Sequence, residues 1–112
     1  MTDRNGVASV YLNKLVSALG VLDCESIDTA SELILQAWSD GKQIITLGNG
    51  GSSLTALHMI NDWNKSIFLE TRKPFRGRSL VDNIGLLMSY ANDVSFQDVF
   101  IEQLENIMQP GD

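Results

Sequence analysis

The sequence predicts a small α/β fold in which helices flank a parallel sheet. Strand-like apolar segments alternate with amphipathic helical patterns, an order that implies parallel strands joined by right-handed crossovers. The stronger strand candidate, 43–47, runs directly into the glycine-rich stretch GNGGS. The 112 residues are enough for one modest core. Two strands make a poor sheet, and the chain stops on PGD, a turn that normally leads into a strand, so we expect half of an α/β domain.

Two helices precede the first strand. Apolar residues at three- and four-residue spacings predict an amphipathic helix over 7–19, which Gly20 ends. Ser26 is the expected N-cap of a second helix over 26–38. Gly41 is the expected left-handed residue behind that helix.

A third helix is predicted over 52–65, directly behind the glycine-rich stretch, and Leu54, Leu57 and Ile60 are expected to face inward. The basic stretch ETRKPFRG follows as a turn-rich loop. Its four positive charges within TRKPFRGR have two interpretations, a solvated loop or a means of drawing anionic substrates to a nearby site.

The last part of the chain reads as one weak strand and two helices. RSLVD is the weaker strand candidate, at 78–82. Asn83 is expected to open a helix over IGLLMSYA, and Ser95 to cap a last helix over 96–108. QPGD is expected to form a turn.

Composition excludes several classes of protein. Eight Lys and Arg stand against fourteen Asp and Glu, and the resulting net charge of −6 argues against general nucleic-acid binding. No apolar run approaches the roughly 20 residues of a membrane span. The N-terminus lacks the pattern of a signal peptide, and Cys24 is the only cysteine, which together fit the cytoplasm.

The stretch GNGGS is a candidate phosphate cradle. A loop between a parallel strand and a helix offers free backbone N–H groups and the positive end of the helix dipole. The Lys-Ser/Thr of a Walker loop is missing, and so is the spacing of the dinucleotide fingerprint. A glycine-rich turn without a ligand is an equally good interpretation of the pattern alone.

His58 and Asp62 lie four residues apart and therefore on one helix face. Such a pair can share a metal ion or transfer protons. Two ligands are too few for a metal site, so the pattern by itself favours a surface hydrogen bond.

Taken in order, these motifs resemble the SIS (sugar isomerase) domain family and, within it, the phosphoheptose isomerases. The matching features are GNGGS, a histidine six residues later, AND, F-x-D-V-F and the terminal PGD. The resemblance implies a flavodoxin-like α/β domain. It also implies a ketose–aldose isomerase that converts sedoheptulose 7-phosphate to a heptose 7-phosphate, a precursor of bacterial surface polysaccharides.

The resemblance also implies an organisation of the chain. Residues 1–41 correspond to the helical segment through which family members assemble as tetramers. Residues 42–112 correspond to the first half of the sugar-phosphate-binding domain. No nucleic-acid or membrane partner is implied.

The resemblance assigns roles to single residues. His58 matches a zinc ligand, and Asp62 falls at the position of the catalytic, zinc-binding glutamate, where it also contacts substrate. The other residues implied to bind substrate are Asn49, Gly50, Gly51, Ser52, Asn92 and Asp93.

Two departures from the family leave alternatives open. Aspartate in place of glutamate reaches roughly one carbon–carbon bond less far from the helix, where placement to within about 0.5 Å matters. The family's second half, with its second serine-rich loop and further Gln and His ligands, is absent, so we expect the isolated 112 residues to be inactive. One alternative is a non-catalytic SIS module that binds a phosphosugar or a protein partner such as a replication initiator. The other is a structural fragment that binds nothing tightly.

Overall fold

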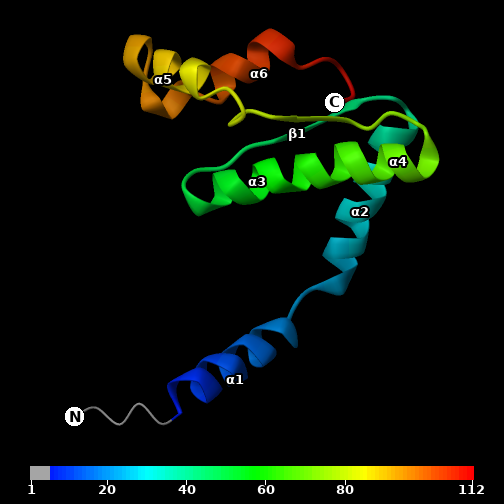
Figure 1. Ribbon diagram of the computed structural model, residues 1–112, viewed down its shortest axis with the longest axis vertical. Coiled ribbons are helices and arrows are strands. Elements are labelled where there is room, and N and C mark those ends of the chain that lie inside the picture. The colour runs from blue at the N-terminus through cyan, green and yellow to red at the C-terminus, as the bar shows by residue number, and fades with distance from the viewer. Residues whose placement is uncertain (1–5) are drawn as a thin grey trace. The chain divides into compact units, whose positions relative to one another are not determined.

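The computed structural model describes residues 6–112, which divide into two compact units at Glu32/Leu33, inside the second helix. The expected α/β class is confirmed (Figure 1). The elements in order are α1 (Val7–Leu19), α2 (Cys24–Ser39), β1 (Gln43–Thr46), α3 (Gly51–Asp62), the π-helical turn η1 (Trp63–Ile67), α4 (Phe68–Thr71), β2 (Arg76–Ser79), α5 (Ile84–Asp93), the 3-10 turn η2 (Phe96–Asp98) and α6 (Ile101–Ile107).

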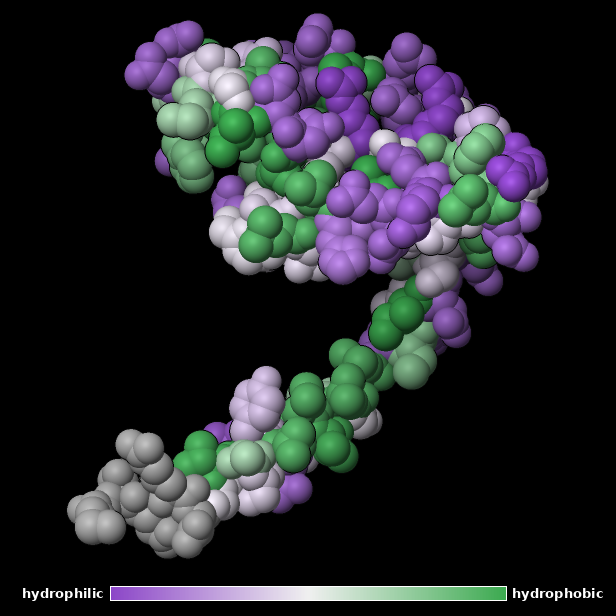
Figure 2. Space-filling view, in the orientation of Figure 1, coloured by the Kyte–Doolittle hydropathy of each residue, from purple (hydrophilic) through white to green (hydrophobic). Residues whose placement is uncertain are grey.

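The first unit contains α1 and the beginning of α2. The helix expected over 7–19 is confirmed as α1, and every one of its side chains is exposed. Figure 2 shows apolar side chains gathered over this part of the chain. Among residues 6–112, no single helix is long and apolar enough to cross a membrane, and α1 and α2 meet such criteria only when they are taken together as a bent pair.

The cap of α2 differs from the prediction. The helix begins at Cys24, and Asp23 caps it: the Ser26 N–H donates to Asp23 Oδ1 at 3.3 Å and the Ser26 hydroxyl to Asp23 Oδ2 at 2.6 Å. These two bonds lower the pKa of Asp23, the hydroxyl contributing most. Ser26 lies in the first turn, where its N–H needs an acceptor, and the carboxylate three residues earlier supplies one.

The two strands form a parallel pair in which Ile44 lies opposite Gly77. Directly after β2, the Leu80 N–H donates to the Thr46 carbonyl at 2.9 Å. The strand expected over 78–82 was placed too late, because β2 covers Arg76–Ser79. Leu80 leaves only 1% of its surface exposed, so its burial contributes to this register.

The helical segment after β1 is longer than predicted. The helix α3 runs over Gly51–Asp62 and continues through η1 into α4, which ends at Thr71. A π-helical turn is rare and often marks a functional position. Leu54 is 70% exposed, contrary to the prediction that it faces inward.

Both caps predicted after β2 are formed. The Asn83 side chain accepts the Leu86 N–H at 3.0 Å and caps α5. The Ser95 hydroxyl accepts the Asp98 N–H at 3.2 Å, but it caps only the short turn η2. The single helix expected over 96–108 is therefore two pieces, η2 and α6.

The buried core of the second unit is small. Its apolar members are Ala56, Ile60, Phe75, Leu80 and Val99. The buried amide of Gln103 in α6 donates to the carbonyls of Leu80 and Val99 at 3.3 and 2.8 Å. These bonds satisfy the amide and attach α6 to the end of β2.

The basic loop has a structural role at the end of α2. Lys73 donates from Nζ to the Ser39 carbonyl at 2.9 Å and lies over the Trp38 ring at 4.8 Å. Arg76 donates to the Gly41 carbonyl at 3.1 Å. Cations at a helix C-terminus stabilise its unpaired carbonyls. Arg76 opens β2, so this group lies at the amino end of the strands, away from GNGGS, which does not support a role in attracting substrate.

The terminal PGD turn docks on the start of β1. Asp112 accepts the Gln43 backbone N–H at Oδ1 and the Gln43 side-chain amide at Oδ2, both at 2.9 Å. Lys42 donates from Nζ to the Pro110 carbonyl at 2.7 Å. The bond from the Gln43 N–H is the largest cause of a lowered Asp112 pKa.

Replacing Asp112 by Asn is expected to destabilise the fold at neutral pH and to matter less in acid. A carboxylate whose pKa is lowered on folding stabilises the fold above the unfolded value, and this contribution is lost as pH falls through the folded value, here below 3.8. Thermal unfolding followed across this range measures the effect. Asp82→Asn is the control, because the Asp82 carboxylate makes no hydrogen bond within residues 6–112. A pH-independent difference between Asp112→Asn and wild type would contradict the prediction.

Candidate functional site

The glycine-rich loop lies at the carboxyl end of β1, where ligands of open α/β sheets bind. Gly50 has φ 57° and ψ −126°, a conformation open mainly to glycine. A Cβ on Gly48 would lie 2.7 Å from the backbone carbon and oxygen of Ser52. At Gly51 a Cβ would meet nothing within 4 Å. Two of the three glycines are therefore required by the loop itself.

Gly48→Ala is expected to destabilise the protein by about 1–3 kcal/mol, the usual cost of overpacking. The added methyl group meets backbone atoms of Ser52, which cannot move away without shifting the start of α3. Gly51→Ala is the matched control, and we expect it to be neutral or slightly stabilising because alanine favours the helix. Thermal unfolding of the two variants checks this, and equal destabilisation would refute the steric argument.

The two serines at the start of α3 differ in their surroundings. The Ser53 hydroxyl donates to the Gly50 carbonyl at 2.6 Å, so it braces the loop. The Ser52 hydroxyl makes no hydrogen bond to the part of the chain that the structure describes. The N–H groups of Ser52 and Ser53 donate to the carbonyls of Asn49 and Gly50, both at 3.1 Å. Ser52 is thus the serine whose hydroxyl can accept or donate to a ligand.

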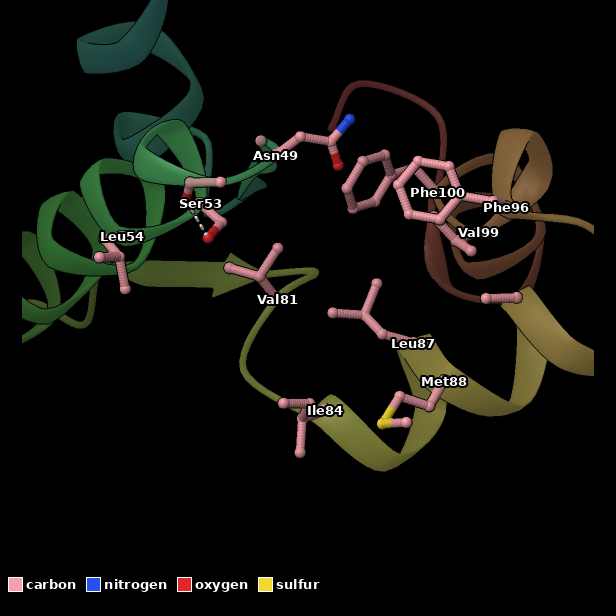
Figure 3. Close-up of a pocket in the computed structure, with 13 residues that line it drawn as sticks. Asn49, Ser53, Leu54, Val81, Ile84, Leu87, Met88, Phe96, Val99 and Phe100 are labelled. Atoms are coloured by element: carbon pink, nitrogen blue, oxygen red, sulfur yellow. Dashed lines mark hydrogen bonds between the residues drawn. The ribbon is translucent and has the colours of Figure 1, made fainter.

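A cavity of about 440 Å³ opens beside the loop (Figure 3). This volume is within the usual range for small-molecule sites, roughly 300–1,000 Å³. Asn49 lines it from the loop, Ser53 lines it from the start of α3, and apolar side chains form most of the remaining lining (Figure 3). These apolar residues are Leu54, Val81, Ile84, Leu87, Met88, Ala91, Phe96, Val99 and Phe100. Phe96 lines the cavity and is 67% exposed.

The predicted substrate residues do not all meet at this cavity. Asn49 and Gly50 line it. Ser52 instead lines a groove between β1 and α3, together with Thr46 and Met59. The start of α3 therefore separates the Ser52 hydroxyl from the apolar cavity.

His58 and Asp62 contact each other on α3. His58 Nε2 lies 3.0 Å from Asp62 Oδ2, and the two side chains are 75% and 56% exposed. Neither lines the cavity, although Leu54, one turn before His58, does. The predicted pair is thus formed, on an open helix face.

His58 and Asp62 supply only part of what a zinc site needs. A nitrogen and an oxygen of the right kinds lie together, but catalytic zinc has three protein ligands and structural zinc four. Among residues 6–112, no group of three or more His, Cys, Asp and Glu side chains is placed to hold a metal ion. The described residues therefore do not make a zinc site by themselves.

Asn92 and Asp93 end α5 and bond to each other. Asn92 Nδ2 donates to Asp93 Oδ1 at 2.7 Å, and both side chains are exposed. Ala91, the residue before them, lines the cavity. The pair therefore lies next to the cavity and outside its lining.

The glycine loop GNGGS and the histidine six residues behind it are among the features that carry the resemblance. The SIS domain profile matches residues 10–112. The chain belongs to the SIS domain family. This confirms the predicted family and agrees with the flavodoxin-like α/β class.

Several phosphoheptose isomerases resemble this SIS chain. The probable phosphoheptose isomerase of Thermoplasma acidophilum is 34% identical over 94% of the chain and 57% of its own length. The phosphoheptose isomerase of Synechocystis is 32% identical over 90% of the chain and 52% of its own length. The solved phosphoheptose isomerase of Neisseria gonorrhoeae matches with a TM-score of 0.79 and 26% identity, over 95% of the chain and 55% of the other. The chain spans about half the length of these relatives and corresponds to their N-terminal part.

The apolar lining of the SIS cavity was missed by sequence reasoning. Ile84, Met88 and Ala91 recur at three- and four-residue spacings on α5, a pattern that also predicts an ordinary core face. Exposure distinguishes a cavity lining from a core face, and Ile84 is 72% and Met88 67% exposed. Exposure of this kind cannot be read from spacing.

Proposed function

We propose that the full-length protein is a sugar-phosphate isomerase that converts sedoheptulose 7-phosphate to a heptose 7-phosphate for surface polysaccharide precursors. The observation that carries the proposal is the contact between His58 and Asp62 at 3.0 Å on the helix that leaves the SIS glycine loop. It keeps a carboxylate and an imidazole together at the positions implied for the reactive groups. The phosphoheptose isomerases among the relatives support the substrate class.

The reaction moves a proton between neighbouring carbons. In this proposal the Asp62 carboxylate removes the proton from the carbon next to the ketose carbonyl and returns it to the former carbonyl carbon. The intermediate is an enediolate, whose oxygen must be stabilised. Exposure of Asp62 leaves its carboxylate accessible to a substrate.

The substrate would be held at its phosphate by the loop residues 49–52. The Ser52 and Ser53 N–H groups donate to loop carbonyls, so the donors to the phosphate would be the Ser52 hydroxyl and the N–H groups of Gly50 and Gly51, which bond to no backbone carbonyl within residues 6–112. Asn92 and Asp93 would contact the sugar from the end of α5.

Zinc belongs to this proposal only for the full-length protein. His58 and Asp62 would be two of its ligands, and the metal would stabilise negative charge on the substrate oxygen. The remaining ligands would have to come from outside residues 6–112, because no group of three or more His, Cys, Asp and Glu side chains within them is placed to hold a metal ion.

The same proposal includes a homo-oligomer, a tetramer by analogy with the family, formed through α1 and α2. Apolar side chains of α1 are exposed along its length, which is unfavourable unless another surface covers them. Those more than half exposed are Val7, Val10, Tyr11, Leu12, Val16 and Leu19. A cytoplasmic location is proposed with it, because phosphorylated sugars are substrates of that compartment.

The proposal is tested with purified full-length protein and sedoheptulose 7-phosphate in deuterated water. We expect a heptose 7-phosphate carrying solvent deuterium at the carbon that received the proton, observed by NMR. Sedoheptulose without phosphate is the control and should react far more slowly, because the loop then has nothing to bind. Absence of turnover on any ketose phosphate, together with binding of a protein partner, would establish the non-catalytic SIS module instead.

A further inference from the structure

Asn64 makes a paired contact with the backbone of β2. Its Oδ1 accepts the Gly77 N–H at 2.9 Å, and its Nδ2 donates to the Gly77 carbonyl at 3.0 Å. One side-chain amide thus satisfies both backbone groups of one strand residue. The contact joins η1 to the middle of β2.

These Gly77 groups face away from β1. Backbone hydrogen-bonding groups of successive strand residues alternate between the two edges, and the Leu80 N–H bonds to Thr46 of β1. Gly77, three residues earlier, therefore presents its groups to the outer edge. The Asn64 amide occupies the place that a further strand would take there.

The contact also leaves no space at Gly77. A Cβ on this residue would lie 2.9 Å from Asn64 Oδ1, 2.9 Å from Ile60 Cδ1 and 3.1 Å from the Phe75 ring. The helix thus approaches the strand as closely as glycine permits. Both residues of the contact are needed for this approach.

Asn64 lies two residues beyond Asp62, where the π-helical turn has begun. Two residues correspond to about 200° around a helix, so the two side chains point to opposite sides. Asn64 binds the strand, while Asp62 is exposed and contacts His58. Any rotation or slide of this turn would move Asp62 as well.

Apolar side chains also pack around this turn. Ile60 is buried, and the Trp63 and Phe75 rings lie 5.6 Å apart. Apolar contacts are non-directional, whereas hydrogen bonds require a defined distance and angle. The Asn64 pair is therefore the contact that determines where along β2, and at what rotation, this turn is held.

We propose that Asn64 is a positioning residue: its amide pair with Gly77 holds the end of α3 so that Asp62 lies where the isomerase reaction needs its carboxylate. This rests on the proposed function. Placement matters because an error of about 1 Å can cost about 10²-fold in rate. Asn64 itself touches only protein and acts through the helix.

The kinetic test compares Asn64→Ala with Asn61→Ala in the full-length protein. Asn61 is an exposed asparagine of the same helical segment and precedes Asp62. The Asn61 side chain makes no hydrogen bond within residues 6–112. For Asn64→Ala we expect kcat to fall about 10–100-fold while KM stays within about threefold. Asn61→Ala should keep both values. Asn64→Asp keeps the volume and the bond from the Gly77 N–H, but it sets a carboxylate oxygen against the Gly77 carbonyl, so it should lower kcat at least as much as Asn64→Ala.

A second readout does not depend on activity. The ring Cε1–H signal of His58 in NMR, assigned by its loss in a His58→Gln variant, reports the contact with Asp62. The signal should move in Asn64→Ala and in Asn64→Asp, and stay in Asn61→Ala. If Asn64→Ala does not fold, kcat and the His58 signal of Asn64→Asp decide whether Asn64 positions Asp62.

The outcomes separate the two proposals. An inactive wild type overturns the proposed function, and the His58 signal then decides the role of Asn64 alone. An active wild type with unchanged kcat and an unchanged His58 signal in both Asn64 variants overturns the positioning role. A loss that appears only in KM overturns it too.

Discussion

Asp62→Asn in the full-length protein is expected to lower turnover of sedoheptulose 7-phosphate by about 10²–10⁴-fold, the usual contribution of a general base. The amide keeps the shape of the carboxylate and its place four residues after His58, but it cannot take a proton. Binding of phosphate esters should persist, since the loop residues are unchanged. Steady-state kinetics and calorimetric titration with a phosphate ester measure the two effects separately.

Glu70→Gln is the matched control for this substitution. It also removes one negative charge, from an exposed residue of α4 that lies away from the loop and the His–Asp pair. Its kinetics should equal those of wild type. Turnover by Asp62→Asn at the wild-type rate would show that Asp62 is not the base.

Val16→Glu is expected to weaken self-association by about 10²–10⁴-fold. Val16 is 68% exposed on α1, and burial of such a side chain stabilises an interface by roughly 1.5–3 kcal/mol. A two-fold interface contains the residue twice, so the free energy of association lost on substitution is about twice that of one side chain. Sedimentation equilibrium of wild type and variant gives the dissociation constants.

Asn13→Glu places the same glutamate on the same helix, at an exposed polar position. We expect it to leave association within a few-fold of wild type, because a polar side chain contributes little burial. A wild-type protein that is monomeric at all accessible concentrations would contradict the proposed helical interface. Equal weakening by both variants would mean that charge, and not apolar burial, governs assembly.

Local sequence signals predicted the features that depend on near neighbours. Asn83 caps α5 through a residue three positions away, and Gly41, with φ 70°, follows α2 as expected. The glycine loop was recognised because it must connect a strand to a helix within a few residues. His58 and Asp62 meet because helix geometry brings residues four apart together. Such features need no knowledge of the remaining chain.

The sequence by itself thus determined the α/β order, the SIS loop and the His–Asp pair. Only the tertiary structure decided the start of β2, the docking of Asp112 on Gln43 and the pairing of Asn64 with Gly77. It also placed Ser52 outside the cavity that Asn49 lines. The physical reason is that local propensity and periodicity describe one segment at a time. Strand register and side-chain partners depend on contacts between segments far apart in the chain, here 13 residues for Asn64 and 69 for Asp112.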